Sequence, residues 1–103
     1  MAKLDGAWTF IIKTYMGDFR FRADFTVNGN ELLGTNTDVG SGNISKVKKG
    51  KVDGDDFSYK FTVDTPIGKI NNEMAGSVNA DSTEISGTST NEMGDFEFIG
   101  SRI

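Results

Sequence analysis

The chemistry open to this chain is limited by the side chains that it lacks. Its 103 residues include no His and no Cys, which excludes Ser-His and Cys-His catalysis, disulfides and cysteine-based zinc sites. Acid or base chemistry is therefore left to Asp, Glu, Lys and Tyr. Two of these side chains are catalytic candidates. Asp38 could act as an acid or base in an apolar setting, and the Tyr59 hydroxyl could donate a hydrogen bond to a developing oxyanion.

Other polar side chains fall in step with apolar residues that point to a protein interior. Leu32, Ile70 and Ile85 are predicted to point inward, and every second residue after each should do the same. The polar residues at these inward positions are Asn36, Asp38, Asn72, Ser89 and Asn91. A buried polar group needs a hydrogen-bond partner, and a few such groups above an apolar floor are typical of a small-molecule site. The alternative is that they sit at a wet end of the fold and need no ligand.

The elements that must position these residues are β-strands. Apolar residues recur with a period of two over 8–13, 19–27 and 57–64, which indicates strands with one buried face. The aromatic residues predicted to point inward are Phe19, Phe21, Phe25, Phe57, Tyr59, Phe61, Phe96 and Phe98. Turn signals near residues 17, 29, 41, 54, 67, 80 and 94 separate eight strands with short connections. The expected fold is all-β, an eight-stranded antiparallel up-and-down (meander) barrel. A two-sheet sandwich is the alternative.

An internal repeat suggests how the chain is organised. Thr14-Tyr15-Met16-Gly17 aligns with Thr65-Pro66-Ile67-Gly68, and Glu31-Leu32-Leu33-Gly34-Thr35 aligns with Glu84-Ile85-Ser86-Gly87-Thr88. We therefore expect one domain, 1–103, built from two repeated halves of about 6–54 and 55–103. Neither half could cover its apolar face alone, so the halves should close on each other.

The two ends of the chain carry a short motif. Gly6-Ala7-Trp8 opens the first strand, and Arg102 lies in the last. This arrangement resembles the calycins, which include the lipocalins, the fatty-acid-binding proteins and the avidins. The resemblance implies a lipocalin- or streptavidin-like barrel in which Trp8 and Arg102 are a structural pair that closes one end; a guanidinium can stack on an indole. The chain also resembles short bacterial barrel modules of unassigned activity.

The opposite end would be the open mouth, rimmed by residues near the turns at 16, 40, 67 and 94. The predicted ligand-binding residues are Asn36, Asp38, Tyr59, Asn72, Ser89, Asn91, Tyr15, Met16 and Met93. The leading expectation is a binding protein or accessory module for a small, largely apolar ligand. One alternative is a cofactor-independent isomerase, cyclase or lyase that uses the same cavity. Another is a protein-interaction module with a filled core and an outer patch at Ile11, Tyr15 and Ile99.

Charge and composition limit the kinds of partner that this protein is expected to bind. The net charge of −4 argues against nucleic acid, and the lysines at 46, 48, 49 and 51 are those of a solvated strand. Asp53-Gly54-Asp55-Asp56 lacks the spacing of a calcium loop, so neither a metal nor a cofactor is expected. No apolar run is long enough to span a membrane, and the N-terminal residues lack a hydrophobic signal region. We expect a cytoplasmic protein without nucleic-acid or membrane partners. Whether it forms a homo-oligomer is left open by the sequence.

Overall fold

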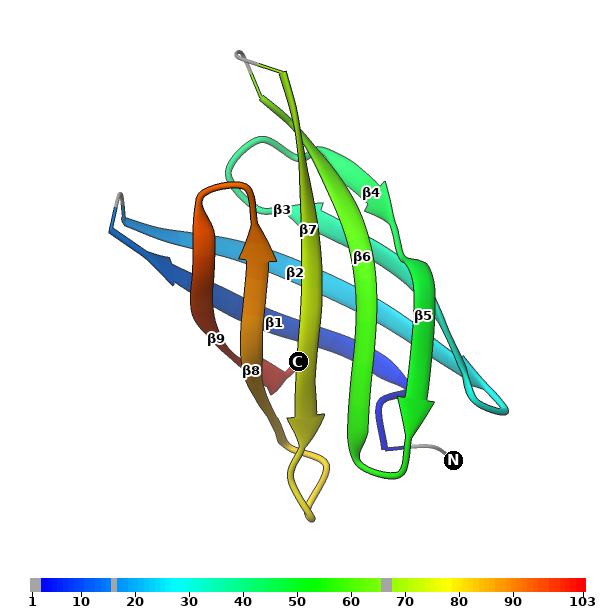
Figure 1. Cartoon of the computed structure of the whole chain (residues 1–103). Helices are drawn as coiled ribbons and strands as arrows, with labels where there is room; N and C mark the ends of the chain where they lie inside the picture. Colours follow the sequence, from blue (N-terminus) through cyan, green and yellow to red (C-terminus); the bar gives the residue numbers. More distant parts are fainter. Residues whose placement is uncertain (1–2, 16, 66–67) are drawn as a thin grey trace.

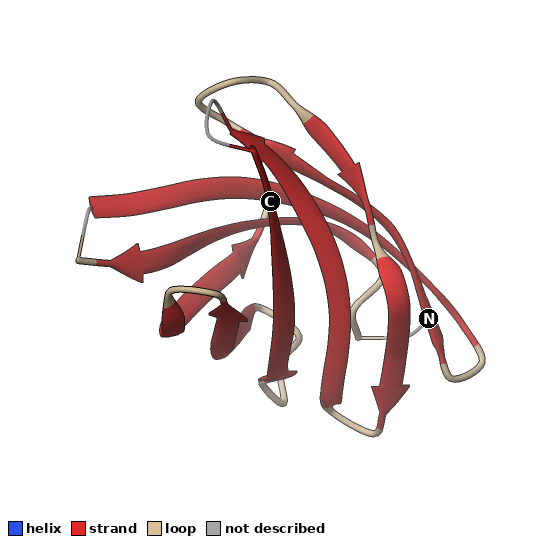
Figure 2. Cartoon of the chain, turned by 45° about the horizontal axis from the view of Figure 1, so that its top comes forward, coloured by secondary structure: helices blue, strands red, loops and turns tan. Residues whose placement is uncertain are grey.

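The computed structural model describes residues 3–15, 17–65 and 68–103, and within these ranges the chain forms strands and turns without a helix. Figure 1 labels the strands and Figure 2 shows how short the loops between them are. The bounds are β1 Gly6–Thr14, β2 Gly17–Asn28, β3 Glu31–Asp38, β4 Ile44–Lys46, β5 Lys48–Asp53, β6 Asp56–Thr65, β7 Gly68–Val78, β8 Glu84–Asn91 and β9 Gly94–Arg102. The described ranges hold no helix that could cross a membrane.

The strands close into a barrel. Apart from β4 and β5, strands that follow each other in the chain pair antiparallel, and β1 also pairs with β9, which joins the two ends of the sheet. β4 and β5 both pair with β3, so they form the fourth barrel strand in two pieces. In Figure 1, β1, β2 and β3 cross behind β6, β7 and β8. The predicted eight-stranded antiparallel meander barrel is confirmed, and the sandwich is wrong.

A register irregularity of the β-bulge type follows the break in the fourth strand at Val47. The register between β5 and β6 shifts between Lys48 and Lys51, and Lys49 has a φ of 51°. A bulge bends one strand and increases its twist. The bulge therefore bends the fourth strand within this lysine-rich segment.

Aromatic rings fill the barrel interior below the mouth. The inward positions of β2 and β6 meet across the barrel, with ring centroids 5.5 Å apart for both Phe21–Phe61 and Phe25–Tyr59. Phe98 of β9 packs against Phe10 at 6.0 Å and Phe57 at 6.3 Å. The predicted inward aromatic side chains, with the exception of Phe19, thus lie in or against one connected core.

Two glycines mark places where neighbouring strands approach too closely for a side chain. A Cβ on Gly34 of β3 would lie 1.9 Å from the backbone oxygen of Asp24 in β2, and Gly34 has a φ of +145°. A Cβ on Gly87 of β8 would lie 2.1 Å from the backbone oxygen of Ala75 in β7. Glycine within a strand is typical of such bends and close approaches.

The end of the barrel opposite the mouth is closed by Trp8 and Arg102. Trp8 is fully buried, and its indole nitrogen donates to the Leu4 carbonyl at 3.0 Å. The Arg102 guanidinium carbon lies 4.3 Å from the centre of the Trp8 ring. The same guanidinium donates to the carbonyls of Ser82 at 2.8 Å and Asp5 at 2.5 Å. The structure therefore brings the two residues of the predicted pair together and ties them to the segment that precedes β1.

Candidate functional site

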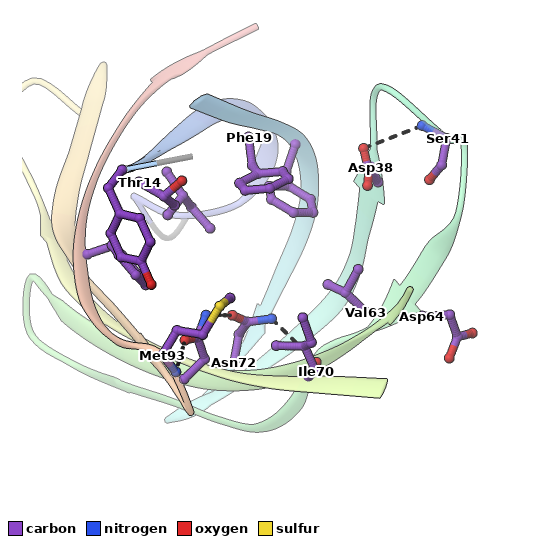
Figure 3. Close-up of a pocket in the computed structure, with 14 residues that line it drawn as sticks. Thr14, Phe19, Asp38, Ser41, Val63, Asp64, Ile70, Asn72 and Met93 are labelled. Carbon is purple, nitrogen blue, oxygen red and sulfur yellow. Dashed lines mark hydrogen bonds between the residues drawn. The ribbon is translucent and has the colours of Figure 1, made fainter. Parts of the chain in front are cut away.

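A cavity of about 280 Å³ opens at the mouth of the barrel (Figure 3). Most of its lining is apolar: Ile12, Phe19, Phe21, Val63, Ile70 and Phe96, with Tyr15 and Met93 also contributing. The polar lining residues are Thr14, Asp38, Ser41, Asp64, Asn72 and Asn91. The volume is near the lower limit for small-molecule pockets, and a mostly apolar wall with few polar groups is their usual composition.

The cavity brings together five of the residues predicted to bind a ligand: Tyr15, Asp38, Asn72, Asn91 and Met93. Tyr15 lines the cavity while being 75% exposed, with its ring 5.7 Å from that of Phe96. The predicted outer patch also included Ile11 and Ile99. Those two isoleucines pair with each other between β1 and β9. Met16 lies outside the described residues.

Three predicted residues point into the barrel but do not line the cavity. Asn36, Tyr59 and Ser89 are buried. Asn36 pairs with Ala23, two residues further from the mouth than the Phe21–Asp38 pair. Alternation predicts the face of a strand that a residue occupies, and it does not predict depth below the mouth. These three side chains therefore belong to the interior under the cavity.

Some lining residues were missed by the sequence analysis. Asp64 and Ser41 are out of step with the inward positions, and Thr14 precedes a hairpin. Strand alternation loses its meaning where strands end at the rim, because both faces are then close to the opening. Proximity to the turns of the mouth was the available signal for all three.

An amide pair forms one wall of the cavity. The side-chain nitrogen of Asn91 donates to the side-chain oxygen of Asn72 at 3.1 Å, and the oxygen of Asn91 accepts the backbone N–H of Met93 at 2.8 Å. The nitrogen of Asn72 makes a long contact of 3.5 Å to the Ile70 carbonyl. An amide nitrogen has two hydrogens to donate, so Asn72 retains donor capacity for an acceptor atom in the cavity.

Asp38 stands at the end of β3. Its Oδ1 accepts the backbone N–H groups of Gly40 at 2.9 Å and Ser41 at 3.4 Å, which holds the turn into β4. No Lys or Arg of the described chain forms an ion pair with Asp38. The ion pairs among the described residues are Lys3–Asp55, Arg22–Asp24 and Lys60–Glu73. The described residues also contain no group of three or more potential metal ligands.

A buried polar layer lies beneath the cavity. The Tyr59 hydroxyl donates to Oδ1 of Asn36 at 3.1 Å, and burial raises the pKa of Tyr59 far above its ordinary value of 10.0. The side-chain nitrogen of Asn36 and the hydroxyl of Ser89 have no hydrogen-bond partner among the described residues. The layer therefore combines one satisfied contact with two unsatisfied groups.

The burial of Tyr59 predicts a loss of stability at alkaline pH. Above pH 10.0 the unfolded chain releases the Tyr59 proton while the folded chain keeps it, so the free energy of unfolding falls as the pH rises, by up to about 1.4 kcal/mol per pH unit from this group. Denaturant unfolding across this range would measure the loss. A Tyr59→Phe variant should show a shallower slope; identical slopes would contradict a buried, neutral Tyr59.

The unpaired hydroxyl of Ser89 predicts a stabilising substitution. Ser89→Ala removes a buried polar group without a partner, so we expect the free energy of unfolding to rise by about 1 kcal/mol. Ser86→Ala, on the exposed face of the same strand, is the matched control and should change stability by less than about 0.5 kcal/mol. A loss of stability in Ser89→Ala would instead indicate that a buried water completes the hydrogen bonding.

Comparisons with known proteins establish the fold class. No protein-family model matches the sequence, and no curated protein is significantly similar to it. Among solved structures, a redesigned β-barrel, b11L5F_LGL, matches with a TM-score of 0.69 and 13% identity over 98% of this chain and 92% of that one. A redesigned β-barrel, mFAP1, bound to DFHBI, matches with a TM-score of 0.68 and 15% identity over 98% of this chain and 95% of that one. The chain is a small antiparallel β-barrel.

Proposed function

We propose that this protein binds a small, largely apolar molecule in the mouth cavity. The observation that carries the proposal is the cavity itself: an apolar hollow of about 280 Å³ with a few polar groups on its wall, above a core of packed apolar side chains. Pockets of this composition are the usual sites of small-molecule binding. The similar barrel mFAP1, which is bound to DFHBI, supports the use of such a scaffold for small molecules.

Catalysis in the same cavity has less support. Tyr59 does not line the cavity, and its hydroxyl is committed to Asn36. Asp38 does line it, so an isomerase, cyclase or lyase reaction would rest on this carboxylate. Its Oδ1 already holds the turn into β4. Binding requires nothing beyond the cavity and is the simpler proposal.

The test combines an unbiased search for a ligand with a defined probe. Native mass spectrometry of the purified protein would detect a co-purifying apolar molecule. Calorimetric titration with naphthalen-2-ylmethanol, a neutral aromatic alcohol, would measure binding to the cavity. We expect one molecule of the alcohol to bind per chain. No bound molecule and no binding of the alcohol would contradict the proposal.

Filling the cavity should weaken binding. Ile70→Phe places a larger side chain on the cavity wall, so we expect the affinity for naphthalen-2-ylmethanol to fall about tenfold or more, because the probe and the new ring compete for one space. Ile99→Phe, on the outer face of β9 where Ile99 is half exposed, is the control and should bind like the unmodified protein. Equal affinities for the two variants would place the probe elsewhere.

A further inference from the structure

The charged side chains that line the cavity carry one sign. They are Asp38 and Asp64, and no Lys or Arg of the described chain contributes to the lining. We infer that the ligand is an organic cation, an aromatic or otherwise apolar body that carries an ammonium group. This inference rests on the proposed function, since it concerns the ligand of the same cavity.

Asp38 is the main source of this selectivity. The residue is half-buried, one carboxylate oxygen holds the adjoining turn, and the other accepts no hydrogen bond from the described chain. No cationic side chain of the described residues lies within ion-pair distance. A carboxylate partly withdrawn from water and without a counter-ion is costly. An ammonium group in the cavity would supply both the missing charge and the missing hydrogen-bond donor.

Asp64 contributes less. Its residue is exposed and lies opposite Lys69 in the β6–β7 register. Figure 3 shows the Asp64 side chain directed away from the cavity. Lys13, an exposed lysine of β1, lies opposite Asp18 in the β1–β2 register. Both lysines thus have an acidic cross-strand neighbour, and neither lines the cavity.

The aromatic walls favour the same kind of ligand. Phe19, Phe21 and Phe96 line the cavity, and Tyr15 packs on Phe96. The face of an aromatic ring attracts a cation, and the attraction grows where water is excluded. The same rings would stack on a flat apolar body. A carboxylate ligand would meet Asp38 in this space without a cationic side chain to receive it, so fatty-acid-like anions should be rejected.

The experiment compares three probes that share one aromatic body and differ in charge: naphthalen-2-ylmethylammonium, naphthalen-2-ylmethanol and naphthalene-2-carboxylate. At neutral pH and low salt, calorimetry should show the ammonium binding about fivefold more tightly than the alcohol, with the carboxylate weaker than both. Asp38→Asn keeps an oxygen for the turn but removes the charge, so the preference of ammonium over alcohol should fall to about one. Asp81→Asn, an exposed residue of the β7–β8 turn at the closed end, makes the same change in net charge and should keep the preference.

The possible results separate this inference from the proposed function. If the alcohol binds and the ammonium binds no more tightly, the inference of a cationic ligand is wrong and the proposed binding function stands. If none of the three probes binds, the binding function fails with it. An advantage that survives in Asp38→Asn would overturn the role of Asp38. Should that variant not fold, the salt dependence of the unmodified protein decides: a charge-based preference weakens as salt rises, and a preference independent of salt overturns the inference.

Discussion

Replacing Gly34 with Ala should lower the free energy of unfolding by about 4 kcal/mol. Two costs combine in this change. The φ of +145° is one that residues with a side chain rarely adopt, and the new Cβ would lie 1.9 Å from the backbone oxygen of Asp24. Backbone strain of this kind and overpacking each cost roughly 1–3 kcal/mol. Denaturant unfolding followed by circular dichroism would measure the loss.

Gly94→Ala is the matched control for this substitution. Gly94 has a φ of +126°, but a Cβ there would have no atom within 4 Å. The control should lose only the strain, about 1–2 kcal/mol. The difference between the two variants isolates the contact of β3 with β2. Equal losses would show that the close approach of these strands does not limit stability.

Trp8→Ala should destabilise the barrel to a similar extent, by about 4 kcal/mol, because removal of a fully buried indole leaves a cavity in the core. It also removes the hydrogen bond to the Leu4 carbonyl and the ring beneath Arg102. Chemical unfolding monitored by circular dichroism is the appropriate measurement, since the variant has no other Trp to report by fluorescence.

A double-mutant cycle with Arg102→Ala would separate the stacking contact from the rest of the loss. The guanidinium lies 4.3 Å from the indole centre, so the two substitutions should be non-additive by about 1 kcal/mol. Additive losses would mean that Arg102 stabilises this end of the barrel only through its hydrogen bonds to the backbone carbonyls of Lys3, Asp5 and Ser82 and to the Ser82 hydroxyl.

The strands were predictable because one face of each is buried. Trp8, Phe10 and Ile12 alternate in the sequence and are all buried in β1, and short turns between such strands leave few topologies other than a meander. The bulge at Lys49 was not predictable. Its segment consists of lysines around a glycine, and without apolar alternation the sequence carries no sign of the register shift.

For the candidate site, the sequence predicted which side chains point into the barrel, but it did not predict how far below the mouth each one lies. Asn36 and Asp38 are neighbours in phase on β3, yet Asp38 lines the cavity and Asn36 lies in the buried layer beneath it. The stagger between strands determines which inward residues reach the same level, and a single sequence does not encode that stagger in a readable form. The depth of Phe19 was also not predictable. Phe19 was predicted to point inward and it does line the cavity, but it lies at the mouth and is 44% exposed.

The pairing of β1 with β9 has a consequence for folding. With β4 and β5 taken as one barrel strand, every other pairing among the described strands joins neighbours along the chain, and this one joins Trp8 to Arg102. Contacts between residues so distant in sequence are entropically the most expensive to form, so we expect the hairpins to assemble first and this seam to close last. Before closure the chain is an open sheet, and β1 and β9 are its two free edges, each able to pair with another chain. Conditions that slow the pairing of β1 with β9 should therefore increase aggregation during refolding, without destabilising molecules that have already folded.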